Sequence, residues 1–399
     1  MRDKAFTLRK ELVVTPSPIM GAQEDHDDTF RLLRESIRRY VEKEIVPKGD
    51  GWEEQGFVPR EVLQEMGRLG YLGLRYPEEF GGAGLDARAT ALLAEELGRS
   101  TFGGFAITVL VHTDMASPHL VNAGTPEQIK RFLPKIISGE AITAVAVTEP
   151  DAGSDVKAIR TSAKRESDGW VLNGTKMFIT NGALADVVFF AAKTDPAAGS
   201  KGLSMFIVEN GMKGFSVGRK LDKHGWRSSD TAELVFDGCR VPAANLLGEE
   251  GRGFYAIMRN FQNERIAIGS MAIGESAKAL EITLEYVKTR KAFGAPLWDK
   301  QAIRQRLAML AAKVEAGRQL VWHAASLDAA GRDCVKEVSM VKAYCGELVN
   351  EVMYDCVQFH GGAGYLRESA IERMSRDARV QSIGGGATEV MLEEVAKRL

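Results

Sequence analysis

Several features that mark particular classes of protein are missing from this sequence of 399 residues. Its four cysteines include no CxxC pair and its six histidines form no HExxH motif, so we expect neither a disulfide framework nor a structural metal. No apolar run reaches the roughly 18 residues that a transmembrane helix needs. The charged start, residues 1–4, does not resemble a signal peptide, and the acidic Asp3 and Glu11 argue against a transit peptide.

An excess of charge of one sign is also missing. Lys and Arg number 52 against 54 Asp and Glu, which leaves a formal net charge of −2. This balance gives no electrostatic case for a nucleic-acid or membrane partner. With 45% hydrophobic residues over this length, we expect a soluble, cytoplasmic protein of two or three domains whose cysteines are buried free thiols.

Three patterns of hydrophobic residues follow one another along the chain. Residues 1–25 are polar and predict a flexible arm, and residues 26–140 repeat apolar side chains at intervals of three and four, which is typical of helices. Residues 141–250 change to short segments of period two, which favour a small β-barrel or sandwich. Residues 251–399 return to a helical pattern. The expected fold class is therefore α+β and multi-domain.

Individual elements can be predicted within this scheme. In the β region we expect a strand at 141–147, two strands around a tight Asn173–Gly174 turn within 170–180, and further strands at 187–190, 203–208 and 232–236. The C-terminal region predicts four long helices and a short final one. Its breaks fall at 294–296, 330–331, 361–364 and 384–386, where glycines and a proline interrupt the pattern.

One apolar stripe of the helix that begins near residue 254 includes a carboxylate. Spacings of 4, 3, 4 and 3 join Ile257, Phe261, Glu264, Ile268 and Met271. Burying an ionised Glu costs several kcal/mol unless it is paired. Either an arginine of a neighbouring helix, such as Arg304 or Arg306, neutralises Glu264, or its pKa is moved towards neutrality and it is poised as a general base.

Three loops are rich in residues that suit ligand binding. The triple glycine 384–386 precedes the final helix, where backbone amides could face an oxygen or phosphate, and 361–364 is a similar loop. Segment 148–155 places hydroxyls and small residues at the end of a strand. Each of these loops is equally compatible with an ordinary turn. No GxGxxG opens a βαβ unit and no GxxxxGK[ST] is present.

Five segments together resemble the acyl-CoA dehydrogenase family. They are 146–155 (AVTEPDAGSD), 173–181 (NGTKMFITN), 290–294 (RKAFG) followed by Gln301, 358–365 (QFHGGAGY) and 376–378 (RDA), and they follow the family order between about residues 27 and 399. The resemblance implies an N-terminal helical domain at 26–140, a central β-barrel at 141–250 and a C-terminal four-helix bundle at 251–399. This order agrees with the hydrophobic patterns.

The family binds FAD without a covalent bond, usually as a homotetramer in which each flavin touches two subunits. The resemblance implies substrate contacts from Ser154 and Arg265, and it places Arg290, Phe293 and Gln301 at a neighbour's cofactor. The full set of implied cofactor residues is Val147, Thr148, Gly153, Ser154, Phe178, Ile179, Thr180, Arg290, Phe293, Gln301, Gln358, Gly361, Gly362, Ala387 and Glu389. Two departures are Phe178, where many members have Trp, and Ala387, where many have Thr.

The position of the base separates subfamilies. Many members carry the catalytic Glu in the turn before the last helix, where this sequence has Gly385. Isovaleryl- and long-chain-type members instead use a Glu-Arg motif on the helix after the barrel, which Glu264–Arg265 matches. The resemblance thus implies that Glu264 removes an α-proton while a hydride passes to flavin N5, and that a flavin ribityl hydroxyl and the Gly385 N–H bind the thioester oxygen. Glu149 and Glu389 are rival carboxylates.

Several alternatives stay open from the sequence. Electrons leave for an electron-transfer flavoprotein in the dehydrogenases and for oxygen in oxidase relatives, and the thioester could belong to a carrier protein instead of coenzyme A. A flavin monooxygenase or nitroalkane oxidase and a non-catalytic flavin-binding protein share the fold. Gly103 and Gly104, if they lie at the pocket floor, would leave room for a long or branched acyl chain, and the same glycines are also compatible with a plain interhelical turn.

Overall fold

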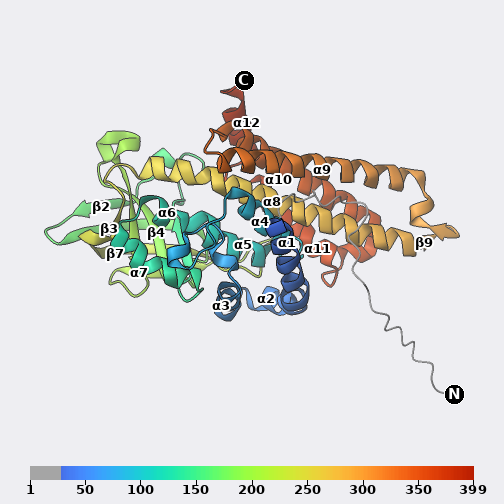
Figure 1. The fold of residues 1–399 in the computed structure, drawn as a ribbon, viewed down its shortest axis with the longest axis horizontal. Helices are drawn as coiled ribbons and strands as arrows, with labels where there is room; N and C mark the ends of the chain where they lie inside the picture. Colours follow the sequence, from blue (N-terminus) through green and yellow to red (C-terminus); the bar gives the residue numbers. More distant parts are fainter. Residues whose placement is uncertain (1–27) are drawn as a thin grey trace, which may run out of the picture.

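The computed structural model describes residues 28–399, so the arm predicted at 1–25 lies outside the described residues. The described chain runs through a helical part, a β-sheet and a second helical part with much longer helices (Figure 1). The predicted order of helices, β domain and helices is therefore confirmed. No helix among residues 28–399 is long and apolar enough to cross a bilayer.

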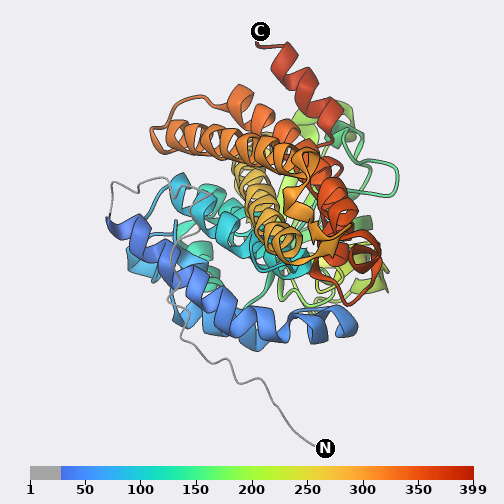
Figure 2. The ribbon, with the colours of Figure 1, turned by 90° about the vertical axis from the view of Figure 1, so that its right-hand side faces the viewer.

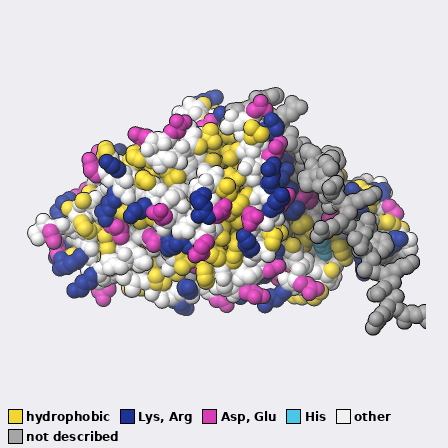
Figure 3. All heavy atoms as spheres, turned by 60° about the horizontal axis from the view of Figure 1, so that its bottom comes forward, with side chains coloured by type: hydrophobic (Ala, Val, Ile, Leu, Met, Phe, Trp, Pro, Cys, Tyr) yellow, Lys and Arg dark blue, Asp and Glu magenta, His cyan; other side chains and the backbone are white. Residues whose placement is uncertain are grey.

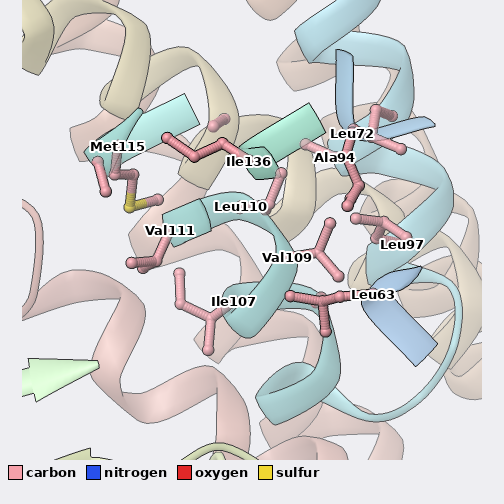
Figure 4. Close-up of a cluster of buried hydrophobic side chains, with 14 of the residues drawn as sticks. Leu63, Leu72, Ala94, Leu97, Ile107, Val109, Leu110, Val111, Met115 and Ile136 are labelled. Carbon is pink, nitrogen blue, oxygen red and sulfur yellow. The ribbon is translucent and has the colours of Figure 1, made fainter. Parts of the chain in front are cut away.

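The N-terminal part packs short helices around one apolar core. Figure 4 shows Val109 and Leu110 of α5 pointing towards Leu63, Leu97 and their neighbours from other helices, and these side chains are buried. Directly after α5 the chain widens into one π-helical turn, η5 (Val111–Ala116). The α-helices are α1 (Asp28–Tyr40), α2 (Gly49–Gln55), α3 (Arg60–Arg68), α4 (Ala87–Gly98), α5 (Gly103–Leu110), α6 (Pro118–Ala123) and α7 (Pro126–Ile137).

The middle part is one eight-stranded sheet. Its hydrogen-bonded order is β6-β7-β3-β2-β4-β5-β8, and β1 pairs with β4 in parallel. A separate apolar cluster fills the sheet's own interior. The strands are β1 (Thr143–Ala146), β2 (Ser162–Arg165), β3 (Gly169–Thr180), β4 (Val187–Lys193), β5 (Leu203–Glu209), β6 (Phe215–Lys220), β7 (Thr231–Pro242) and β8 (Leu246–Leu247).

The hairpin predicted at Asn173–Gly174 is wrong, because β3 continues through this dipeptide as one strand. β2 pairs with the first half of β3 and β7 pairs along most of its length, so the backbone bonds of β3 go to neighbours on both sides. Gly174, at φ +142°, marks a register shift against β7, and Asn173 accepts a hydrogen bond from the Gly238 N–H at 2.8 Å. The dipeptide therefore forms a bulge and not a turn.

The C-terminal part contains three long helices and not the four expected. The breaks fall where the glycines predicted them, but the fourth helix, α11, stops after nine residues and passes into a tighter turn. The hairpin β9 (Lys291–Ala292) and β10 (Ala295–Pro296) joins the first two long helices, and α12 projects from the body in Figures 1 and 2. The helices are α8 (Gly253–Thr289), α9 (Gln301–Ala329), α10 (Val335–His360), α11 (Ala370–Ala378) and α12 (Thr388–Ala396).

Gly103 and Gly104 belong to the joint between the three parts, where other residues fill the space beside them and leave no room there for an acyl chain. A Cβ on Gly103 would lie 2.7 Å from the ring of Trp226, and one on Gly104 would overlap the side chain of Ser228. Both glycines are needed for close packing of α5 against this loop. Asp377 of α11 closes the joint by accepting hydrogen bonds from the N–H groups of Gly103 at 3.0 Å and Trp226 at 2.6 Å.

Candidate active site

Glu264 lies in the middle of α8 and is buried. α8 is not a surface helix with one apolar stripe: every residue from 263 to 277 is buried, because α4, α10 and η5 pack around it. A carboxylate in this position loses most of its hydration. Burial raises the pKa of Glu264 to about 7, although a hydrogen bond from Asn260 and the positive charge of Arg265 act in the opposite direction.

The alternative in which an arginine of the next helix neutralises Glu264 is wrong. Arg304 donates to a backbone carbonyl at 3.0 Å, and Arg306 forms ion pairs with two acidic residues of α10. The adjacent Arg265 reaches Ser339 on α10, with 3.3 Å between Nη1 and Oγ. Among the described residues Glu264 therefore has no ion-pair partner, and it keeps a pKa suited to proton transfer near neutral pH.

The glycine turn before α12 packs against α8 one helical turn beyond Glu264. A Cβ on Gly385, at φ +65°, would overlap the side chain of Ile268, which is one helical turn beyond Glu264. The buried Lys342 of α10 holds this turn by donating to the carbonyls of Gln381 and, at 3.0 Å, of Gly386. The Gly385 N–H itself donates to no acceptor within residues 28–399, so it is available to a ligand oxygen.

Of the two rival carboxylates, Glu149 is tied into the structure. Its side chain forms an ion pair of 2.9 Å with the fully buried Lys176 and accepts hydrogen bonds from the N–H groups of Arg160 at 2.7 Å and Thr161 at 3.0 Å. Burial acts to raise the pKa of Glu149, but the Lys176 charge and these donors outweigh it and lower the pKa below its usual range. Glu389 is exposed in the first turn of α12.

The Glu149–Lys176 pair also fixes two predicted binding segments to each other. Lys176 donates to the Val147 carbonyl at 2.8 Å, and the Met177 N–H donates to the Thr148 carbonyl at 2.9 Å. Residues 147–148, after β1, therefore lie against the end of β3. The structure brings these parts of the predicted cofactor set together.

Phe178 stands out at the end of β3. Its φ is +61°, it lies within a second register shift against β7, and the residue is 65% exposed. A bulky residue in this backbone region is uncommon and signals a position that its surroundings impose. Ile179 points into the interior of the sheet and Thr180 is half-buried, so Ile179 offers only its backbone to a ligand.

Three hydroxyl groups of the predicted cofactor segments have no hydrogen-bond partner within the described chain. Thr148, Thr180 and Ser154 donate no side-chain hydrogen bond to residues 28–399. Gly153 and Ser154 are exposed in the turn after β1, and a Cβ on Gly153 would meet nothing within 4 Å. An exposed aromatic face flanked by free hydroxyls and open backbone suits a planar ligand with polar edges.

A second group of predicted cofactor residues lies at the other end of the molecule. Phe293, at φ +53°, forms the tip of the β9–β10 hairpin with 96% of its side chain exposed, while Arg290 and Gln301 flank the hairpin. Figure 1 places β9 at the opposite end of the molecule from β3. The structure thus does not bring this group together with Phe178 in one chain.

The remaining predicted residues divide between these regions. Tyr286, near the end of α8, contacts His360 at the end of α10, with 3.1 Å between the Tyr286 hydroxyl and the His360 carbonyl. The exposed Gln358, Gly361 and Gly362 therefore lie at the hairpin end, and a Cβ on either glycine would meet nothing within 4 Å. Ala387 and Glu389 follow the Gly385 turn at the start of α12.

Neither a patch of one charge on the face shown in Figure 3 nor a metal-ligand cluster of the described residues competes with this site. Lys and Arg side chains alternate with Asp and Glu over most of the face in Figure 3, so no field of one sign covers it. Within residues 28–399 no cluster of His, Cys, Asp and Glu could hold a metal ion. All four cysteines are buried and free, which confirms the predicted free thiols.

Two residues beside Glu264 were missed by the sequence reasoning. Asn260 lies one turn earlier on α8 and hydrogen-bonds to the carboxylate at 3.0 Å, and Lys342 supports the glycine turn. The sequence does give a weak signal for Asn260, which is spaced four residues from Glu264 and so shares its helix face. Nothing in the sequence connects Lys342 with residues 381–386.

Comparisons with known proteins point to one family throughout the chain. Residues 27–140 match the family described as "Acyl-CoA dehydrogenase, N-terminal domain", residues 144–239 match its "middle domain" and residues 251–399 match its "C-terminal domain". Among curated relatives, the long-chain specific acyl-CoA dehydrogenase of Sus scrofa mitochondria is 43% identical over 377 residues, which are 94% of this chain and 86% of that protein. An acyl-CoA dehydrogenase of Bacillus subtilis is 39% identical over 92% of this chain and 97% of its own length.

Solved structures agree with these relatives. An acyl-CoA dehydrogenase from Geobacillus kaustophilus superposes with a TM-score of 0.90 at 38% identity, over 94% of this chain and 99% of that one. A chain from an electron transferring flavoprotein structure of Acidaminococcus fermentans gives 0.91 at 35% identity, over 93% and 98%. PigA in complex with FAD gives 0.90 at 28% identity, over 93% and 97%.

Proposed function

The chain belongs to the acyl-CoA dehydrogenase family and binds FAD, and we propose that it converts a saturated acyl-CoA thioester to the trans-2-enoyl-CoA with Glu264 as the base. One observation carries this proposal. Glu264 is a buried carboxylate without an ion-pair partner in the described chain, and it lies beside a glycine turn with a free N–H. A base and an oxyanion donor side by side are what removal of a proton α to a carbonyl requires.

Proton removal is the part of the reaction that the chain's own residues perform. A thioester α-proton is far too weakly acidic for an ordinary carboxylate in water. With its pKa raised by burial to about 7, Glu264 is a stronger base than a solvated Glu and is still ionised in part at neutral pH. In this proposal the α-hydrogen leaves as a proton to Glu264, and its electron pair enters the new double bond.

Negative charge then develops on the thioester oxygen and must be stabilised. We assign this role to the backbone N–H of Gly385, which needs no side chain to act. Lys342 supports it indirectly, because its bonds to the carbonyls of Gln381 and Gly386 hold the turn on both sides of Gly385. Ser154 and Arg265 are the further residues that we propose for substrate contacts.

When bound, FAD would be the oxidant, accepting the β-hydrogen of the substrate as a hydride. The residues present fit such a group, since the exposed Phe178 face has the free hydroxyls of Thr148 and Thr180 beside it. We propose that Phe293 and the hairpin end of a neighbouring subunit complete the cofactor site. This arrangement requires at least two copies of the chain, as in the homotetramer implied by the resemblance.

The acyl group, the electron acceptor and the location are proposals of the same kind. The Sus scrofa relative is a long-chain enzyme, and an isovaleryl-CoA dehydrogenase of Solanum tuberosum is 37% identical over 94% of this chain and 91% of that protein. We therefore propose a long or branched acyl chain. The Acidaminococcus fermentans neighbour supports an electron-transfer flavoprotein as acceptor, and a cytoplasmic location remains the expectation from the sequence.

The test is an anaerobic titration of the FAD-loaded protein with straight and branched acyl-CoAs, followed by flavin absorbance. We expect bleaching with the preferred chain, and its loss in Glu264→Gln with FAD and acyl-CoA binding retained. Near-wild-type turnover of Glu264→Gln would overturn the role of Glu264. A flavin that stays oxidised with every acyl-CoA would favour a carrier-protein thioester or a same-fold oxidase or monooxygenase.

A further inference from the structure

The side chain of Asn260 joins Glu264 to the backbone of η5. Its Nδ2 atom lies 2.8 Å from the Met115 carbonyl oxygen and 3.0 Å from Oε1 of Glu264. A carbonyl oxygen only accepts, so the group facing Met115 must be the NH2 and not the amide oxygen. Both hydrogens of that NH2 are then used, one on the carbonyl and one on the carboxylate.

This contact belongs to a seam of two asparagine amides against η5, of which Asn263 also accepts a hydrogen bond from Arg75 at its amide oxygen. Three residues further along α8, Asn263 donates from Nδ2 to the Asp114 carbonyl at 2.7 Å. Asp114 and Met115 are consecutive residues of the π-helical turn η5, whose wider backbone bonding leaves carbonyls that side chains can reach. Two asparagines of one helix therefore hold two neighbouring carbonyls, but only Asn260 also contacts Glu264.

The two oxygens of Glu264 consequently differ. Oε1 accepts a hydrogen bond from Asn260. Oε2 accepts no hydrogen bond from residues 28–399, and it is not fully enclosed by protein atoms. The nearby charged side chains of η5, α10 and α8 contact other groups, although Nε of Arg265 has no partner within the described residues. Asp114 of η5 accepts from Thr90 at 2.6 Å, Lys342 of α10 holds carbonyls, and Arg265 reaches Ser339.

We propose that Asn260 is a positioning residue that ties Oε1 of Glu264 to η5 and leaves Oε2 as the oxygen that takes the substrate proton. The inference rests on the function proposed above and goes beyond it by assigning the two oxygens different tasks. A general base must lie within hydrogen-bond reach of the proton that it removes. A carboxylate that rotated about its last bonds would meet this condition only part of the time, and the amide prevents that rotation.

The test compares Asn260→Leu, which keeps the approximate volume and removes both donors, with Asn263→Leu as the matched control on the same seam. The first readout is the pKa of the Glu264 carboxyl by infrared titration, with the band identified by its loss in Glu264→Gln. The second is the rate of flavin reduction by acyl-CoA in the FAD-loaded protein. If N260L does not fold, Asn260→Ser, which is smaller and keeps one donor, takes its place.

For N260L we expect the pKa of Glu264 to rise by about one unit, because a donor to the ionised form is lost. Reduction at neutral pH should slow on the order of 10- to 100-fold while FAD content and acyl-CoA affinity stay unchanged. N260S should change both in the same directions by less. N263L should leave the pKa and the reduction rate near their wild-type values.

The two proposals fail in different ways. If N260L and N263L change the pKa and the rate alike, the contact is merely structural and the inference is overturned. If wild type is reduced normally and N260L matches it, the inference fails while the proposed function stands. If no acyl-CoA reduces wild type, the proposed function fails together with proton transfer to Oε2, and a pKa shift in N260L would then support only the contact.

Discussion

Gly385 packs against Ile268, one helical turn beyond Glu264 on α8, so closely that a Cβ on Gly385 would overlap the Ile268 side chain. The turn before α12 and the Glu264 carboxylate are therefore neighbours in space although 121 positions separate Glu264 from Gly385 in the chain. A base placed at either position would reach the same region. In this protein the glycine makes room for Ile268 and places a free backbone N–H near the proposed base.

Replacing Gly385 by alanine should damage the site more than the small change suggests. The new alanine would have to keep φ near +65°, which costs about 1–2 kcal/mol for a residue with a Cβ. The overlap with Ile268 would also displace the turn and the N–H that we assign to the thioester oxygen. We expect at least about a tenfold loss of kcat, since one oxyanion donor contributes about 100- to 1,000-fold.

The control for this variant is Gly51→Ala. Gly51 lies in α2, where a Cβ would meet nothing within 4 Å and φ is not positive, so alanine there should slightly raise stability and leave kcat unchanged. Steady-state turnover and urea unfolding of both variants measure the two effects. Equal kcat values for the two variants would contradict the role of the Gly385 turn.

Glu264→Gln should stabilise the protein at high pH. The folded-state pKa of Glu264, about 7, lies above its value in the unfolded chain. Between these two pKa values the carboxyl ionises in the unfolded chain but stays protonated in the folded one, so wild type loses stability as the pH rises from the unfolded pKa to about 7. A glutamine cannot ionise and avoids this loss. Relative to wild type, the variant should gain on the order of 2–3 kcal/mol between about pH 4.5 and pH 8.

Urea unfolding of both proteins at the two pH values checks this prediction. The control is Glu389→Gln, because Glu389 is exposed in the first turn of α12. That variant should show no comparable pH-dependent gain. A difference between Glu264→Gln and wild type that stays constant with pH would show that Glu264 is not held in its neutral form by burial.

Lys176→Met should weaken FAD binding indirectly, through the segments that Lys176 holds together. Lys176 is fully buried and forms the 2.9 Å ion pair with Glu149, so its removal leaves a buried carboxylate unpaired, at a cost of about 3–5 kcal/mol. The Val147 carbonyl would lose its donor as well. We expect low FAD content after gel filtration and a lower urea midpoint.

Arg165→Met is the matched control for this variant. The Arg165–Glu250 pair is short, at 2.6 Å, but its side chains are exposed, and such pairs contribute about 0–1 kcal/mol. The control should therefore keep its full FAD content. Comparable FAD loss in both variants would show that the buried pair does not hold the cofactor segments.

Glu264 could be predicted from the sequence, and the reason is physical. A carboxylate within an apolar stripe conflicts with the rule that governs its neighbours, and such conflicts concentrate at functional sites. The expectation that the stripe faces one core was nevertheless too simple, because α8 is surrounded on all sides over residues 263–277. The pattern predicted a buried carboxylate at Glu264 without describing what surrounds it, and its role as the base stays a prediction.

Other features depend on contacts between distant segments and were not predictable. Asn173–Gly174 has the local signature of a hairpin, but pairing of β3 with both β2 and β7 overrides it. The role that we propose for Asn260 depends on its hydrogen bond to a carbonyl of η5, some 145 residues earlier in the chain. From the sequence, Gly103 and Gly104 suggested space for an acyl chain, whereas in the fold the loop with Trp226 and Ser228 fills the space beside them.

The separation of Phe178 from Phe293 predicts that two copies of the chain build each cofactor site. Phe178→Ala should damage the sheet side of the site and Phe293→Ala the hairpin side, and each alone should lose most FAD and activity. When both variants are co-expressed, random pairing gives mixed dimers in about half of the cases. In each mixed dimer one site combines two intact sides and the other combines two damaged ones.

About a quarter of all sites should therefore be intact, and activity should recover to about a quarter of the wild-type value. This recovery has a simple physical origin, since Phe293 is exposed at a hairpin tip and contributes nothing to the core of its own chain. FAD content and reduction rate of the co-purified, differently tagged mixture measure it, with each variant expressed alone as the control. A mixture no more active than the two variants expressed alone would show that each chain completes its own site, and the hairpin would need another role.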